Sequence, residues 1–261
     1  MRFASLGSGS EGNALIVEAR SGSTTTRVLL DCGFSAKELE RRLARLDCTI
    51  DMLDAVLVTH EHSDHIGSAL TVARKWSIPL YTSWGTARAV GADCAPDVEL
   101  HVLWGDETAS IGDLQLSPYT VPHDAREPLQ FVFSDGAHRL GVLTDVGTST
   151  PHITSMLDGC DALVLECNHD PAMLAASRYP QSLKARIGGN HGHLSNEAAA
   201  GILASLDRSR LQHIVAAHLS QQNNQAGLAQ AALADVLNAQ HHDVVVASQA
   251  DGFAWLALGG Q

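Results

Sequence analysis

The feature that most constrains the fold is a run of seven residues that follows a short apolar segment. The run is Thr59-His60-Glu61-His62-Ser63-Asp64-His65, and the apolar segment is residues 54–58, which is typical of a buried strand. Three histidines and Asp64 fall within six residues. The chain must therefore fold so that this strand ends at an accessible sheet edge, where loops commonly carry functional sites.

The spacing within this run suits metal binding. His60 and His62 lie two residues apart, so on an extended backbone both side chains point the same way and can bind one ion. Asp64 and His65 turn into the start of the following helix and can bind a second ion nearby. The alternative is a polar helix cap with surface histidines. The density of ligand groups favours the metal site.

Along the rest of the chain, short runs rich in Val, Ile and Leu alternate with helical spacings. This pattern predicts a layered α/β fold in which helices cover the faces of sheets. The predicted strands are 14–18, 27–30, 54–58, 78–81, 131–134, 139–144, 162–166, 214–217, 244–247 and 253–258, with further strand-like runs between 100 and 121. The predicted helices are 35–46, 66–76, 86–91, 172–186, 195–206 and 227–239. Because no stretch is typical of a linker, we expect one domain over residues 1–261.

Composition narrows the class of protein. The formal net charge is −12, which argues against a nucleic-acid module that works by bulk positive charge. It leaves room for an enzyme on phosphodiesters, because bound cations would supply positive charge locally. The five cysteines are scattered without a CxxC pair, so we expect no disulfide framework. Without a signal segment or an 18-residue apolar run, we expect a soluble cytoplasmic protein that does not enter a membrane. Whether it forms a homo-oligomer stays open.

Further Asp and His residues follow strand-like runs elsewhere in the chain. Asp31-Cys32-Gly33 follows the second predicted strand, and His123, Asp145 and His218 each stand at a strand end. Together with the HxHxDH pattern, these positions resemble the metallo-β-lactamase superfamily along most of the chain. The resemblance implies a four-layered αβ/βα sandwich, in which two mixed sheets are flanked by helices and a two-metal site lies at one edge.

The resemblance also implies seven metal ligands in two sets joined by one carboxylate. They are His60, His62 and His123 for the first ion, Asp64, His65 and His218 for the second, and Asp145 as the bridge. The ligands suit zinc or manganese equally, so we expect two divalent ions, Zn²⁺ or Mn²⁺. Asp31 is a candidate to orient an imidazole from behind, with capping of the loop as the alternative.

Two single residues and three further segments narrow the branch within the superfamily. Secreted β-lactamases of this fold commonly have Cys where this chain has Asp145, which argues against antibiotic hydrolysis. The oxidoreductase branch has Glu in place of His62, which argues against redox chemistry. The segments SLGSGSEGNALIV, LECNHD and AHLSQQNN resemble the compact YycJ-like branch over the whole chain. That branch is related to ribonuclease Z and ribonuclease J, and the resemblance implies a 5′-to-3′ exonuclease.

Two segments are candidates for binding phosphate. His193 stands in the turn Asn190-His191-Gly192-His193-Leu194-Ser195-Asn196, which is similar to a turn that carries a proton-donating histidine in ribonuclease Z. Ser195, as a helix N-cap, would add backbone N–H groups. Ser8, Ser10 and Asn13 in the polar loop would offer further contacts. The alternatives are a plain helix cap and an ordinary strand connection. Glu11 departs from the branch by placing a carboxylate near a polyanion, and the roles of His169 and His191 stay open.

We therefore expect a dimetal phosphodiesterase or nuclease, with a nucleic acid or a small phosphodiester as its substrate. A metal-bridging hydroxide would attack phosphorus, with Asp64 and His193 as the catalytic side chains. One alternative is a thioester or lactone hydrolase of the glyoxalase II type, and another is a non-catalytic scaffold. Aromatic residues are 5% of the chain, too few to suggest a stacking platform for bases.

Overall fold

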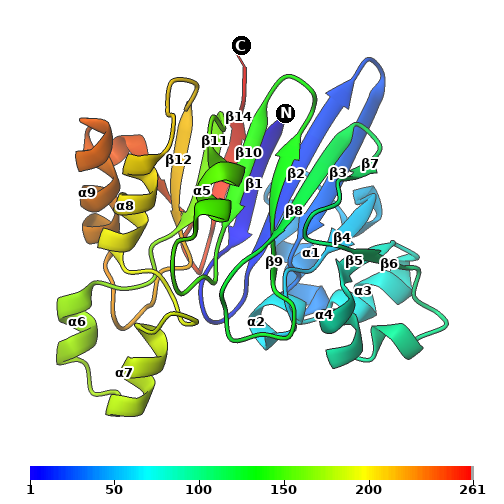
Figure 1. Cartoon of the computed structure of the whole chain (residues 1–261). Coiled ribbons are helices and arrows are strands. Elements are labelled where there is room, and N and C mark those ends of the chain that lie inside the picture. Colours follow the sequence, from blue (N-terminus) through cyan, green and yellow to red (C-terminus); the bar gives the residue numbers. More distant parts are fainter. Residues whose placement is uncertain (260–261) are drawn as a thin grey trace.

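The computed structural model describes residues 1–259, whose strands form two seven-stranded sheets packed face to face (Figure 1). The last two residues of the expected domain lie outside this range. The first sheet has the order β14-β1-β2-β3-β4-β5-β6 and the second β13-β12-β11-β10-β9-β8-β7. Both sheets mix parallel and antiparallel pairs. The expected fold class is thereby confirmed.

The bounds of the strands in the first sheet are β1 Arg2–Gly7, β2 Ala14–Ser21, β3 Thr24–Leu30, β4 Ala55–Leu57, β5 Leu80–Ser83, β6 Leu100–Leu103 and β14 Phe253–Ala257. Those in the second sheet are β7 Ala109–Ile111, β8 Leu114–Thr120, β9 Leu129–Ser134, β10 Arg139–Leu143, β11 Ala162–Glu166, β12 His213–Ala217 and β13 Val244–Val246.

Helices cover the outer face of each sheet, which gives the four layers. The first sheet carries α1 Ala36–Ala44, α2 Ser63–Ile66, α3 Ala69–Trp76 and α4 Trp84–Ala89. The second carries α5 Pro151–Leu157, α8 Asn196–Ser205 and α9 Ala226–Leu237. Two short helices, α6 Pro171–Ala176 and α7 Gln181–Ile187, extend beyond the sheet edge at the lower left of Figure 1.

Side-chain alternation explains the layering. On β2, Val17 belongs to the buried cluster between the sheets, whereas its neighbour Ile16 packs outward with Leu39 and Leu43 of α1. A third cluster joins the outer face of the second sheet to its helices, for example through Ile202. Successive residues of a strand point to opposite faces, so strands that are apolar on both faces can be covered on both.

Three sequence expectations were wrong in detail. The helix expected over 66–76 is two helices, because Gly67 has φ +32° and a Cβ there would collide with the carbonyl of Cys32. The helix expected over 172–186 is also split, into α6 and α7, since Pro180 starts a new helix. The strands expected over 14–18 and 27–30 are longer, as β2 and β3, and β1, which precedes them, was not predicted.

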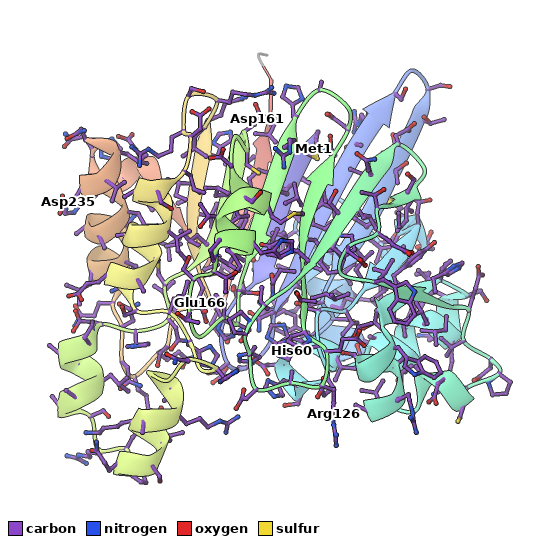
Figure 2. All side chains as sticks on the ribbon, in the orientation of Figure 1. Met1, His60, Arg126, Asp161, Glu166 and Asp235 are labelled. Atoms are coloured by element: carbon purple, nitrogen blue, oxygen red, sulfur yellow. The ribbon has the colours of Figure 1, made fainter. Side chains whose placement is uncertain are left out.

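The strand directions gather the predicted site residues at one edge. β3 and β4 are parallel, as are β10, β11 and β12. Asp31 and His60 follow the first pair, and Asp145 and His218 follow β10 and β12. Because the carboxyl ends of parallel strands meet at one edge, these residues converge. Figure 2 shows His60 and Glu166 at this lower end of the sheets and Asp161 at the opposite end.

Candidate metal centre

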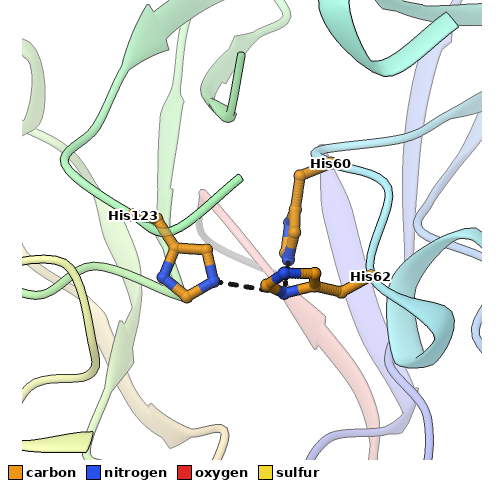
Figure 3. Close-up of side chains that lie close together, drawn as sticks. All are labelled: His60, His62 and His123. Carbon is orange, nitrogen blue, oxygen red and sulfur yellow. Dashed lines mark hydrogen bonds between the residues drawn. The ribbon is translucent and has the colours of Figure 1, made fainter. Parts of the chain in front are cut away.

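Three histidines from two segments face one another at the sheet edge (Figure 3). His60 Nε2 lies 3.0 Å from His62 Nδ1, and His123 Nε2 lies 3.4 Å from the same nitrogen. Tetrahedral zinc with Zn–N bonds of about 2.0–2.1 Å would hold its ligand atoms about 3.3 Å apart. The spacing of these nitrogens therefore suits one shared cation.

A second set lies beside the first. Asp64 Oδ2 is 3.5 Å from both His65 Nε2 and His218 Nε2. Asp145 lies between the two sets, with Oδ2 3.1 Å from His65 Nε2, and its carboxylate can share one cation with His60 and His65. The structure thus brings together all seven residues that the sequence analysis selected as ligands, in the two predicted sets with Asp145 between them.

Contacts to the ring nitrogens that point away from the cluster fix the orientation of two imidazoles. Asp31 Oδ2 lies 2.8 Å from His65 Nδ1, and Asp31 Oδ1 accepts a hydrogen bond of 2.9 Å from the backbone N–H of Thr59. Asp31 therefore both orients an imidazole and caps the loop. His123 Nδ1 lies 3.1 Å from the carbonyl oxygen of Gly192, so its Nε2 points to the cluster. Such partners fix which ring nitrogen is free to bind a metal.

The backbone is also unusual at the cluster. Asp31, Asp145 and His218 have φ values of 61°, 54° and 53°, in the left-handed region that non-glycine residues rarely adopt. Each such residue costs roughly 1 kcal/mol or more, and residues of this kind concentrate at functional sites. The three residues follow β3, β10 and β12, so the turn at each strand end aims a side chain into the site.

The donor groups of the cluster fit a divalent cation. Asp145 Oδ2 and His218 Nε2 are buried and have no hydrogen-bond partner of good geometry within residues 1–259. Burial opposes protonation of His218, but Asp145, Asp64 and Glu166 outweigh it and raise its pKa to about 10. Buried carboxylates at this density require positive charge, and a metal ion supplies it without a proton.

Glu166 is a functional candidate that the sequence analysis missed. Its buried Oε1 lies 2.8 Å from His193 Nδ1 and 3.3 Å from His218 Nδ1, and Oε2 accepts backbone N–H groups of Val146 and Leu194. Burial would raise the pKa of Glu166, yet the charge and hydrogen bond of His193 and the contact with His218 lower it to about 2. A carboxylate ending the otherwise apolar strand 162–166 was the available signal, since a buried charge needs partners.

The residues predicted to contact phosphate divide into three groups. Ser8 and Asn13 are buried and support the ligands: Ser8 Oγ accepts from the backbone N–H of His218, and Asn13 Nδ2 lies 3.2 Å from His65 Nε2. Ser10 and His193 line an open cleft of about 240 Å³. Ser195 caps α8 and faces a separate cavity of about 500 Å³.

The residues whose roles the sequence left open lie around these cavities. His169 is buried and lines the 500 Å³ cavity with Ser195. The side chains of His191 and Glu11 are exposed, and neither belongs to a group of potential metal ligands among the described residues. Tyr179 and Arg186, which the sequence analysis did not select, line the cleft, and Arg186 pairs with Asp124 at 2.6 Å.

Within residues 1–259, no helix is both long enough and apolar enough to cross a membrane.

Comparisons with known proteins identify the family of the chain. Residues 26–214 match the family described as the beta-lactamase superfamily domain. The exodeoxyribonuclease YycJ of Bacillus anthracis is 35% identical over 240 residues, which are 91% of this chain and 89% of that protein. The exodeoxyribonuclease WalJ of Streptococcus pneumoniae is 32% identical over 227 residues, covering 85% of this chain and 83% of that protein.

The solved structure of the metallo-β-lactamase fold protein YhfI from Bacillus subtilis shares the fold, with a TM-score of 0.74 at 17% identity over 98% of this chain and 99% of that one. The family match and the two relatives confirm the family expected from the sequence. The chain belongs to the β-lactamase superfamily, among relatives of exodeoxyribonucleases YycJ and WalJ, and it is a metal-dependent hydrolase.

Proposed function

We propose that this protein is a phosphodiesterase that removes nucleotides from a DNA strand end in the 5′-to-3′ direction. The observation that carries the proposal is the pair formed by Glu166 and His193 at the cleft, 2.8 Å apart beside the ligand cluster. The exodeoxyribonuclease names of relatives that match nearly the whole chain support the choice of DNA.

We assign the ligands as the two sets predict. The first ion would be held by His60, His62 and His123, and the second by Asp64, His65 and His218, with Asp145 serving both. Two divalent ions, zinc or manganese, would lower the pKa of bound water and neutralise phosphate oxygens. We assign the transfer of protons and the binding of phosphate to side chains of this chain.

His193 is the proposed donor of the proton that the leaving oxygen requires. Burial opposes protonation of its ring, but the charge and the hydrogen bond of Glu166 raise the pKa of His193 above its ordinary value. Glu166 occupies Nδ1, so Nε2 is the nitrogen that can donate toward the cleft. A histidine kept protonated near neutral pH suits a general acid.

Asp64 is the proposed acceptor of the proton from the attacking water. Its carboxylate lines the cleft and is 20% exposed, whereas that of Asp145 is 3% exposed. Asn13 and His218 hold the carboxylate from the protein side. Arg186, at the mouth of the cleft, would bind a non-bridging phosphate oxygen, since guanidinium groups match phosphate geometry.

The test is a substrate panel on protein of known metal content. We expect close to two divalent ions per chain and cleavage of bis-p-nitrophenyl phosphate and of end-labelled DNA. DNA labelled at the 5′ end should release labelled mononucleotide first. Cleavage of a thioester or lactone with every phosphodiester untouched would overturn the proposal and favour the glyoxalase II type. Cleavage of RNA in preference to DNA would overturn the choice of DNA.

A further inference from the structure

A second hollow lies next to the metal centre, and the proposed reaction does not use it. It measures about 440 Å³ and is lined by Trp84, Gly85, Arg88, Ala89 and Arg126. We infer that this Trp84 hollow binds one nucleotide of the DNA strand that extends from the cleft, with its base against Trp84 and its phosphate against the two arginines. The inference rests on the proposed function and names how the same site would hold its substrate.

The Trp84 hollow is joined directly to the ligand run. Glu61 lies between His60 and His62 in the chain, and its Oε1 accepts a hydrogen bond of 2.8 Å from the backbone N–H of Arg126. Its Oε2 accepts from Thr86 Oγ1 of α4 at 3.5 Å. One side chain of the ligand run thus positions both walls of the hollow.

Chain length sets the distance to the metal centre. Arg126 stands three residues after His123, so their Cα atoms lie within about 11 Å. Figure 2 shows Arg126 pointing outward from the molecule just beyond His60. Neighbouring phosphates of an extended single strand are separated by less than this limit. A strand held in the cleft therefore reaches the hollow with its next nucleotide or the one after.

The side chains of the hollow are free to bind a ligand. The indole of Trp84 is 43% exposed, although large apolar side chains are usually buried. The guanidinium of Arg126 makes no ion pair or hydrogen bond with any residue from 1 to 259, and that of Arg88 is 4.0 Å from its nearest carboxylate, Asp93. Two such cations beside one exposed indole stand out in a chain of net charge −12.

This combination matches the chemistry of a single strand. Bases stack on exposed aromatic rings whatever their sequence, and arginine binds the intervening phosphates. The sequence analysis rejected a stacking platform because aromatic residues are few. A low aromatic content of the whole chain does not exclude a local site, and the fold places the exposed Trp84 directly after β5.

The experiment measures binding of a 12-residue oligothymidine with phosphorothioate linkages, which resist cleavage, to the metal-loaded protein. We expect Trp84→Ala to weaken binding roughly 5- to 150-fold, as the loss of one stacked base does, and Trp84→Phe to retain most of it. Arg126→Gln should reduce the slope of log K against log salt by about 0.7, whereas Arg126→Lys should not. Arg208→Gln, beyond the C-terminal end of α8, is the control for loss of a positive charge that forms no ion pair within residues 1–259.

Activity on two substrates separates this inference from the proposed function. Bis-p-nitrophenyl phosphate is too small to span the cleft and the hollow, so Trp84→Ala should lose much more activity on DNA than on this ester. Oligothymidine binding equal to that of the parent protein would overturn the inference, as would equally strong competition by polyglutamate of the same charge. A parent protein that cleaves neither substrate would refute the proposed function, while the binding data would still decide the role of the hollow.

Discussion

The carboxylate of Glu166 and the imidazole of His193 meet at 2.8 Å although they lie 27 residues apart in the chain. Glu166 ends β11, and His193 lies in the turn before α8. Because Oε2 of the same carboxylate accepts two backbone N–H groups, Glu166 is fixed and in turn fixes the ring of His193. Variants of these two residues can therefore test whether His193 donates a proton or binds a metal ion.

Replacing His193 should separate the two roles. We expect His193→Ala to keep both metal ions and to lower turnover of DNA by roughly a hundredfold, because a general acid is lost. The loss should be smaller for bis-p-nitrophenyl phosphate, whose leaving group needs little protonation. Metal analysis and steady-state kinetics check both statements. Loss of metal from this variant would make His193 a ligand and place the assignment of His218 in doubt.

Replacing Glu166 should act through His193. Glu166→Gln keeps the shape of the side chain but removes the charge that raises the pKa of His193. We expect a lower kcat on DNA, and the double variant Glu166→Gln/His193→Ala should be no slower than His193→Ala alone. Residues that act as a unit show such non-additive losses. Losses that multiply in the double variant would show that Glu166 acts independently of His193.

The carboxylate of Asp145 should determine whether the metal centre forms at all. Asp145→Asn tolerates the left-handed backbone at this position but removes the charge that faces both ligand sets. We expect both ions to be lost together, as measured by metal analysis after gel filtration. Asp235→Asn, on α9 and far from the site in Figure 2, should keep both ions. Retention of two ions by Asp145→Asn would remove Asp145 from the bridging position.

The sequence predicted which His and Asp residues lie together at the sheet edge better than it predicted the surfaces around them. His60, His62 and Asp64 are close in the chain, so local spacing alone brings them together, whereas Asp145 and His218 were selected through the resemblance to the metallo-β-lactamase superfamily. Glu166 was not predicted as a functional residue, because its partners come from other segments of the chain.

The Trp84 hollow was not predicted either, because it too is formed by segments that are distant in the chain. Glu61 connects α4 to the loop that carries Arg126, and only the packed structure shows that contact. The break at Gly67 depends likewise on the carbonyl of Cys32, which is distant in sequence. Local sequence patterns predict helices, strands and closely spaced candidate ligands such as those of residues 60–65. Which polar side chains line the same pocket depends on contacts between segments that are distant in the chain.

A buried carboxylate at the end of the first sheet opposite the metal centre should contribute to the stability of the protein in a pH-dependent way. Glu18 is buried on β2 and accepts hydrogen bonds from Arg2, Arg20 and Arg27 at 2.7–2.9 Å. Burial would raise the pKa of Glu18, but Arg2 and Arg27 outweigh it and lower the pKa below its ordinary value.

A lowered pKa in the folded state means that the ionised carboxylate stabilises the fold at every pH above the unfolded value of about 4.3. That contribution is lost as the pH falls through the folded pKa. We therefore expect Glu18→Gln to lower the free energy of unfolding at pH 7 by roughly 1–2 kcal/mol, because three partly exposed arginines lose the carboxylate that they share. The difference between the parent and the variant should shrink below about pH 4.3. Urea unfolding at pH 7 and pH 3.5 measures it, and a difference independent of pH would contradict an electrostatic role for Glu18.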